Sequence, residues 1–332
     1  MKRLFLLLTI FQALYSSAQQ WVKYEGTEGP GKGKHIVFVS GDEEYRSEEA
    51  LPALAQILSK KYGFTCTVLF SIDPATGRIN ALNQNNIPGL EHLRTADLLV
   101  IFTRFRELPD MQMKYIDEYV KAGKPIIGIR TATHAFAYKK TTKSIYAKYS
   151  FDSKVKGWEG GFGKIIFGET WVSHHGIHGK EGTRALINGI EKNAKNPLLN
   201  GVADIWVPTD VYTIRKIGEN FTPLIYGQST NGMTASAPVN LEKPVLPVAW
   251  TKTYIVPNGR KGKVFVTTMG SAIDLLSEDL RRLLINACFW GAGLEKLIPE
   301  KADVDFISEY HPTTFGFDSF KKSVLPSEYQ IK

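Results

Sequence analysis

The sequence is poor in cysteine, with only Cys66 and Cys288 among 332 residues. Two cysteines exclude a framework of several disulfides and a zinc site built from four cysteines. After residue 18, no apolar run approaches the roughly 18 residues that cross a bilayer, so we expect no membrane span. Neither sign of charge dominates, since 41 Lys and Arg stand against 33 Asp and Glu, a formal net charge of +8. The basic residues are spread along the chain, which predicts a solvated surface and no nucleic-acid partner.

The first 18 residues have the pattern of a secretory signal peptide. Lys2 and Arg3 form a charged start, residues 4–15 are mostly apolar, and a run of small residues ends at Ala18. About a dozen apolar residues are too few for a membrane span and are typical of an export signal that is removed. We therefore expect cleavage near Ala18 and a periplasmic or secreted protein.

Residues 35–129 alternate between apolar runs and amphipathic segments. The expected strands are 35–40, 64–70, 97–102 and 125–129, and the expected helices are 51–63 and 109–123. This alternation predicts parallel βαβ units with right-handed crossovers. It predicts an α/β fold of three layers around a central, mainly parallel sheet.

The rest of the chain is expected to extend this unit into one α/β domain over residues 35–298. Residues 19–34 are rich in glycine and are expected to be a flexible lead-in. Residues 131–200 lack regular periodicity and are expected to form an irregular insertion over the site. Later strands are expected at 223–226, 247–250 and 263–268, followed by a helix. Residues 299–332 are expected to pack as an extended C-terminal strap.

Charged and polar residues follow four of the predicted strands. In an open parallel sheet, ligands bind at the carboxyl ends of the strands, so we expect these segments to meet at one edge. The segments are 41–46, 103–107, 130–134 and 269–274. The candidate ligand-binding residues that they supply are Asp42, Glu43, Arg104, Arg106, Thr131 and Asp274.

The segment after residue 129 has the frame of a nucleophile elbow but lacks the nucleophile. A catalytic Ser or Cys would stand at the centre of such a turn, and Arg130 stands there instead. Arginine stays protonated and cannot attack a substrate. Cys66 falls in a predicted strand and Cys288 on the apolar stripe of a predicted helix, so both are expected in the core.

Several ordered segments resemble the ThuA-like (trehalose-utilisation) domain family. They are residues 41–50, 103–110, 128–136, 171–179, 267–270 and 281–288. The resemblance implies the flavodoxin-like, three-layer fold of class I glutamine amidotransferases without their Cys–His–Glu triad, and hence no glutaminase activity. It also implies a role in sugar utilisation, often near oxidoreductases that act on glycosides.

Four histidines are candidates for the chemistry. His174, His175 and His178 lie among glycines in a predicted loop, and His134 follows a predicted strand. One interpretation is binding of a polyhydroxylated ligand with one imidazole as acid or base. A second is a divalent metal held by His174 and His178, and a third is a purely structural role. Joint action with His134 requires that the insertion fold over the carboxyl edge of the sheet.

The favoured hypothesis is an exported protein of carbohydrate metabolism that acts on a sugar or an oxidised (keto) sugar. The expected catalytic residues are His134, His174, His178 and Arg130. The ligand-binding set is completed by His175 and by Trp171, an aromatic residue that can stack on a sugar ring. The expected partner is a small carbohydrate, with no cofactor. The rival hypotheses are a non-catalytic sugar-binding module and a metal-dependent hydrolase.

Overall fold

The computed structural model describes residues 19–190, 193, 195–215 and 221–331. The expected signal peptide, residues 1–18, lies outside the described residues. Within the described part of the chain, no helix combines the length and the apolar character needed to cross a membrane.

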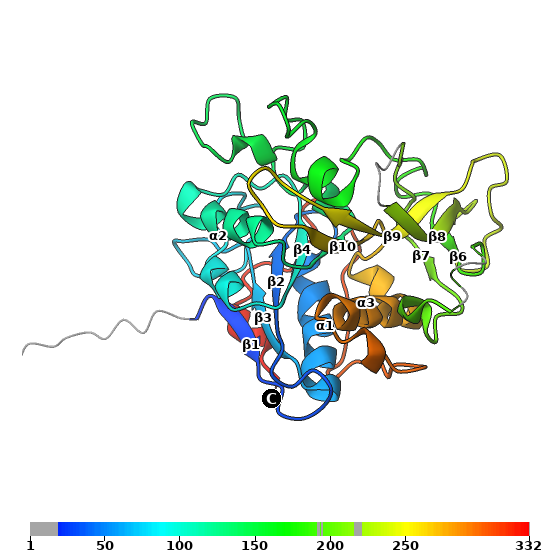
Figure 1. Cartoon of the computed structure of the whole chain (residues 1–332). Coiled ribbons are helices and arrows are strands. Elements are labelled where there is room, and N and C mark those ends of the chain that lie inside the picture. The colour runs from blue at the N-terminus through cyan, green and yellow to red at the C-terminus, as the bar shows by residue number, and fades with distance from the viewer. Residues whose placement is uncertain (1–18, 191–192, 194, 216–220, 332) are drawn as a thin grey trace, which may run out of the picture.

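Ten strands of the described chain form one mixed sheet (Figure 1). Its centre consists of five parallel strands in the order β3–β2–β4–β5–β10. Their bounds are Thr65–Leu69 (β3), His35–Gly41 (β2), Leu98–Thr103 (β4), Ile126–Ile129 (β5) and Gly262–Thr267 (β10). Antiparallel strands extend both edges, with Trp21–Tyr24 (β1) beside β3, and Leu246–Tyr254 (β9), Phe221–Ser229 (β8), Thr183–Leu186 (β6) and Trp206–Val207 (β7) in turn beyond β10.

The expectation of a mainly parallel sheet is wrong, because β1 and every strand beyond β10 pair antiparallel. The connections give the physical reason. β9 and β10 are joined by residues 255–261 alone, whereas a parallel connection needs about a dozen residues or more. Only a hairpin closes so short a gap. β8 and β9 are likewise joined without an intervening helix.

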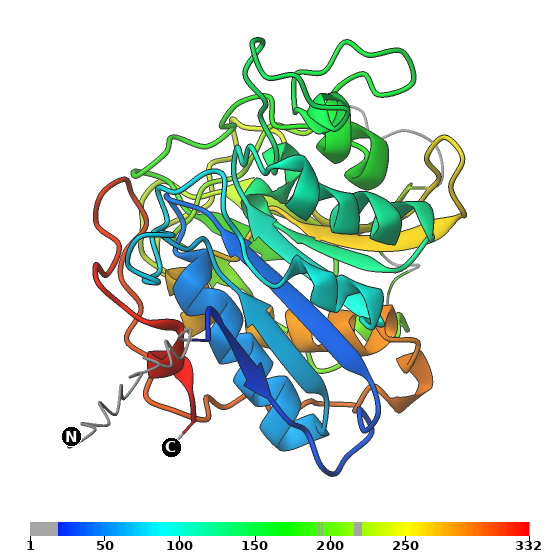
Figure 2. The same cartoon turned by 90° about the vertical axis from the view of Figure 1, so that its left-hand side faces the viewer.

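Helices cover both faces of the sheet and make three layers (Figure 2). α1 (Ser47–Tyr62) and α3 (Glu278–Gly291) lie on one face, and α2 (Asp110–Lys121) lies on the other. Along β2, Ile36 and Phe38 pack on the first face while Val37 and Val39 pack on the second, as the two-residue period of a strand requires. A strand covered on both faces is apolar throughout, which makes β2 recognisable in the sequence.

Short helices fill the connections. Among the described residues, the 3-10 helices are Leu90–Arg94, Arg130–His134, Ala147–Tyr149, Pro197–Leu199, Ile273–Leu276, Glu295–Leu297 and Pro326–Tyr329, and Gly163–Phe167 is a π-helix. The segment 131–200 contains several of these turns. Its later part forms β6 and therefore belongs to the sheet.

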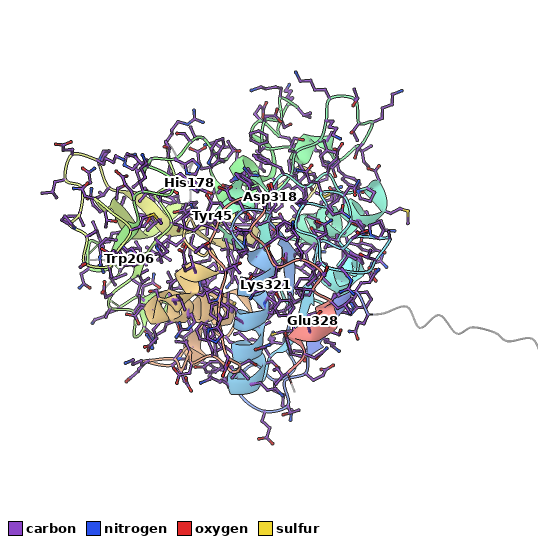
Figure 3. All side chains as sticks on the ribbon, turned by 180° about the vertical axis from the view of Figure 1, so that it is seen from behind. Tyr45, His178, Trp206, Asp318, Lys321 and Glu328 are labelled. Atoms are coloured by element: carbon purple, nitrogen blue, oxygen red, sulfur yellow. The ribbon has the colours of Figure 1, made fainter. Side chains whose placement is uncertain are left out.

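Both ends of the described chain are tied to the body of the protein. Residues 19–34, expected to be a flexible lead-in, contain β1, whose Val22 is fully buried. β1 is short and interrupted by the exposed Lys23, so it lacks the continuous apolar run that identifies β5, which is why the sequence did not reveal it. Residues 299–331 run past α1 as an extended strap (Figure 3). The Tyr24 hydroxyl of β1 donates to the Tyr329 carbonyl of the strap at 2.7 Å.

Candidate functional site

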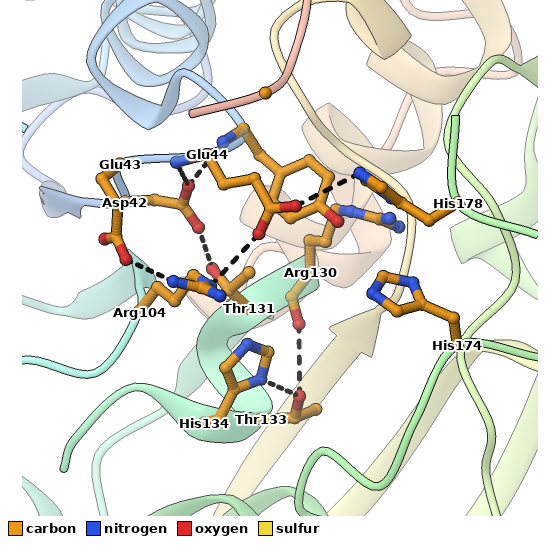
Figure 4. Close-up of polar contacts among 12 residues, drawn as sticks. Asp42, Glu43, Glu44, Arg104, Arg130, Thr131, Thr133, His134, His174 and His178 are labelled. Carbon is orange, nitrogen blue, oxygen red and sulfur yellow. Dashed lines mark hydrogen bonds and ion pairs between the residues drawn. The ribbon is translucent and has the colours of Figure 1, made fainter. Parts of the chain in front are cut away.

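The loops that follow β2, β4 and β5 meet at the carboxyl edge of the sheet (Figure 4). The backbone N–H of Arg104 donates to the Gly41 carbonyl at 2.8 Å, and that of Phe105 donates to the His134 carbonyl at 2.9 Å. The Thr131 hydroxyl donates to the carboxylate of Asp42. The three loops are thus joined into one surface by hydrogen bonds.

The turn after β5 has the backbone conformation of a nucleophile elbow, with Arg130 at its centre. The φ angle of Arg130 is 43°, in the left-handed region that non-glycine residues rarely adopt. Gly128 is required by packing, because a Cβ at this position would lie 2.7 Å from the Phe167 ring. Cys66 and Cys288 are confirmed as buried core residues, and burial raises the pKa of both thiols. Neither cysteine is therefore placed to act as a nucleophile.

A buried aspartate, Asp210, is the centre of a polar group at this edge. Its Oδ2 lies 2.7 Å from His174 Nδ1. Its Oδ1 lies 3.0 Å from Arg130 Nη2 and 3.4 Å from His178 Nδ1. The carboxylate has no exposed surface, whereas the side chains of His174 and His178 are 31% and 35% exposed. We refer to Asp210, Arg130, His174 and His178 as the Asp210 cluster.

Asp210 is the candidate residue that the sequence analysis missed. It belongs to none of the segments that carry the family resemblance, and the strand before it, β7, has only two residues. The search for charged residues directly after a strand, which identified the other loops, could also have identified Asp210. Asp210 is a charged residue shortly after an apolar pair, Trp206–Val207, at a strand end.

The contacts within the cluster lower the pKa of Asp210. Burial alone would raise the pKa of Asp210, but hydrogen bonds from His174 and His178, together with the charge of Arg130, hold this pKa well below its usual range. An ionised carboxylate can only accept, so the proton of the 2.7 Å contact belongs to His174 Nδ1. In the neutral tautomer that donates from Nδ1, Nε2 is the ring nitrogen with the lone pair.

Arg130 is enclosed within the protein. Its guanidinium lies over the rings of Tyr45 and Tyr212, 4.1 and 4.3 Å from their centroids. It donates to the backbone carbonyls of Asp210 and Thr268 at 3.2 and 2.6 Å, and its side chain has no exposed surface. Arg130 therefore has no surface open to a ligand, and its charge lies against the Asp210 carboxylate.

His134 lies buried beside the cluster. Burial, and then the charges of nearby arginines, hold its pKa well below the usual value, so its imidazole is neutral. Its Nδ1 lies 3.1 Å from the Thr133 hydroxyl (Figure 4). The ring of Trp171 lies 5.6 Å from that of His134 and 5.9 Å from that of His174. Trp171 thus links the two histidines.

Arg104 keeps part of its surface in solvent, with a side chain that is 18% exposed. It forms ion pairs with Glu43 and Glu44 (Figure 4). Glu44 also reaches the Asp210 cluster, because its Oε1 lies 3.4 Å from His178 Nε2. Burial raises the pKa of Glu43, although the charges of Arg106 and Arg104 oppose this effect. The Glu44 carboxylate therefore connects Arg104 to His178.

The structure does not bring every predicted ligand-binding residue to the cluster. Arg106 is fully buried and donates to the backbone carbonyls of Ala81 and Asn83. Asp42 accepts from two backbone N–H groups of its own loop and from Thr131. Asp274 accepts from backbone N–H groups after β10, and His175 Nε2 lies 3.0 Å from a carbonyl in another loop. Internal hydrogen bonds account for the polar groups of these residues.

His174, His178 and Asp210 also have the composition of a metal site. One ligand atom from each lies within 4.8 Å of the other two. Two imidazoles and one carboxylate suit Zn²⁺ and similar divalent ions. Because Arg130 pairs with Oδ1, Asp210 fits such an ion as a ligand through one oxygen.

The fold and this edge define an α/β protein with a large mixed sheet, in which Arg130 stands at the centre of the elbow after β5. The sequence profile of the ThuA family, described as trehalose utilisation, matches residues 35–291. The chain belongs to the ThuA family, which confirms the resemblance seen in its motifs.

No curated protein matches the chain. Among solved structures, it is similar to a putative ThuA-like protein from Parabacteroides merdae ATCC 43184, with 14% identity and a TM-score of 0.49 over 91% of this chain and 100% of that chain. It is similar to the mmIFT52 N-terminal domain at 11% identity and a TM-score of 0.38, over 78% of this chain and 97% of that chain. The exo-beta-1,4-mannosidase Op5Man5 from Opitutaceae bacterium strain TAV5 is 10% identical with a TM-score of 0.34, over 80% of this chain and 36% of that chain. All three TM-scores are below 0.5, so these likenesses carry no argument about function.

Proposed function

We propose that the protein acts on a sugar or a keto sugar by acid–base chemistry at the Asp210 cluster. The observation that carries this proposal is the 2.7 Å contact between His174 Nδ1 and Asp210 Oδ2. A buried carboxylate that fixes the tautomer of a partly exposed imidazole is the arrangement of a general base. The family's description as trehalose utilisation supports a sugar as the ligand.

The proposed step is removal of a proton from the carbon next to a keto group. His174 Nε2 takes the proton, the C–H electron pair forms the carbon–carbon double bond of an enolate, and the carbonyl oxygen takes the negative charge. Asp210 stabilises the imidazolium that results. Arg104, partly exposed beside the cluster, is the cation proposed to stabilise the enolate oxygen. His134 is buried, so its proposed role is to position its neighbours.

Turnover of 3-keto-glycosides by His174→Gln and by His175→Gln tests the proposal. The two residues are adjacent, but only the ring of His174 contacts Asp210. Loss of a general base lowers a rate by about 10²- to 10⁴-fold, so we expect this loss in His174→Gln and wild-type turnover in His175→Gln. Normal turnover by His174→Gln contradicts the proposal. Binding without turnover by the wild-type protein supports a sugar-binding module instead.

A metal-dependent hydrolase is a second candidate, favoured by the spacing of His174, His178 and Asp210. These residues would hold the ion, which would supply a Lewis acid or an activated water. Metal analysis of the purified protein and titration with Zn²⁺ distinguish the two candidates. One equivalent of tightly bound metal that is lost in His178→Ala supports the hydrolase. Full turnover after treatment with a chelator supports the metal-free proposal.

Export is the remaining part of the proposal, and the motif at residues 1–18 supports it. N-terminal sequencing of the protein from its native host should begin near Gln19. An intact Met1 on the mature protein contradicts export with cleavage.

A further inference from the structure

The C-terminal strap is anchored to the carboxyl edge of the sheet by buried charged residues. Arg46 has no exposed surface, and its Nε donates to the Thr313 hydroxyl at 3.1 Å while its Nη2 donates to the Gly316 carbonyl at 2.5 Å. The Glu49 carboxylate accepts from both the backbone N–H and the hydroxyl of Thr313 at 2.8 Å. The Gly316 N–H donates to the Glu44 carbonyl at 2.8 Å. The strap is thus held in one position against the loop after β2.

These anchors place one aromatic ring beside the Asp210 cluster and a second beside Arg104. The ring of Phe315 lies 5.4 Å from that of His178 and 5.7 Å from that of Tyr45. The ring of Phe317 lies 5.1 Å from the guanidinium carbon of Arg104. Figure 3 shows the same part of the strap near Tyr45 and His178, at one end of α1.

Phe317 is exposed over more than half of its surface, at 56%. A phenylalanine held at a fixed place with an open face offers apolar contact area at little cost in conformational entropy. The groups beside it are hydrogen-bonding ones, since Arg104 pairs with Glu44, and Glu44 reaches His178. An apolar face beside convergent polar groups suits a ligand that has both characters.

We propose that the strap forms a wall of the ligand site and selects a pyranose ring. The C–H face of the ring packs on Phe317, while its hydroxyl or keto oxygens reach Arg104 and the histidines. An open-chain polyol has no such rigid face and gains less from the contact. This inference rests on the proposed sugar chemistry. It adds that the determinant of ring recognition lies beyond residue 291, where the family match ends.

The test is binding of methyl α-glucopyranoside, trehalose and sorbitol to the wild-type protein, Phe317→Ala and Phe317→Trp, measured by NMR titration. We expect Phe317→Ala to weaken binding of the two pyranosides by roughly 3- to 10-fold, the effect of one aromatic contact. Phe317→Trp should retain this binding, and sorbitol should be affected less. Leu297→Ala is the matched control, because Leu297 is 52% exposed and has no contact with the cluster among those described. Unchanged unfolding midpoints show that the variants are folded.

Three outcomes overturn the inference. They are wild-type binding by Phe317→Ala, an equal loss for sorbitol and the pyranosides, and absence of any pyranoside binding by the wild-type protein. The proposed chemistry fails separately. If Phe317→Ala weakens binding but His174→Gln turns over 3-keto-glycosides normally, the role of the strap in binding is supported and the acid–base role of His174 is contradicted. If Phe317→Ala binds normally but His174→Gln is inactive, the acid–base role of His174 is supported and the role of the strap in binding is contradicted.

Discussion

Arg130 stands at the centre of the turn after β5, the position that a nucleophile occupies in a nucleophile elbow. Its planar guanidinium contacts two carbonyls and one carboxylate oxygen while lying over two tyrosine rings. A lysine ammonium carries the same charge but cannot offer this set of donors from a flat group. The residue is therefore expected to be sensitive even to a change that conserves charge.

Arg130→Lys should destabilise the protein by about 2 to 4 kcal/mol, since part of a buried ion pair and its hydrogen bonds is lost. It should also lower turnover, because Asp210 is no longer held in place. Urea unfolding and turnover of 3-keto-glycosides measure the two effects.

Arg282→Lys is the matched control for this change. Arg282 is also buried and also donates to backbone carbonyls, but it lies on α3 and contacts no member of the Asp210 cluster among the described residues. We expect Arg282→Lys to lose stability without losing turnover per folded molecule. An equal loss of turnover in both variants would show that Arg130 matters only for stability.

At the scale of the element, α1 carries an unusual group in its first turn. Both oxygens of Glu48 are buried and find no hydrogen-bond partner within the described chain. Burial raises the pKa of Glu48 to about 8, and the charge of Arg46 only partly opposes this. The folded protein therefore holds a proton here between about pH 4.5, the ordinary value, and pH 8. Because the unfolded chain releases that proton, stability from this group falls as pH rises through this window.

Glu48→Gln keeps the neutral form and should remove this loss. We expect the wild-type free energy of unfolding to fall, relative to that of the variant, by a few kcal/mol between pH 5 and pH 8, at about 1.4 kcal/mol per pH unit. Urea unfolding at several pH values measures the difference. Other titrating groups, such as His134, are common to both proteins and cancel. Parallel pH profiles for the two proteins would show that Glu48 is ionised in the folded state.

The elements differ in how far the sequence predicts them. The strands at the centre of the sheet are mostly apolar on both faces, and α1, α2 and α3 have apolar stripes, so all of these are predictable. β1 and β6 are interrupted by Lys23 and Arg184, and β7 has only two residues, so none has the continuous apolar run that reveals β5. The direction of β8 and β9 also escapes an analysis that extends the parallel pattern from the first half of the chain.

At the scale of the molecule, the sequence predicts at which edge of the sheet the candidate site forms, but only some of the residues that make up the site. The carboxyl ends of parallel strands meet because of topology, which brings Asp42, Arg104 and Arg130 together. Asp210 reaches the same edge through the antiparallel extension, and the strap reaches it from the end of the chain. Both approaches depend on tertiary packing. Arg106 and Asp274 form hydrogen bonds within the protein. Residue type alone does not distinguish such internally bonded charges from charges that face a ligand.

The central claim is that His174, oriented by Asp210, removes a proton from a keto sugar. The most direct measurement is deuterium incorporation from D₂O into a 3-keto-glycoside at the carbon next to the carbonyl, followed by NMR. The account predicts incorporation with the wild-type protein and a rate at least about 100-fold lower with His174→Gln and with Asp210→Asn. Equal incorporation by His174→Gln, or none by the wild-type protein, would contradict it.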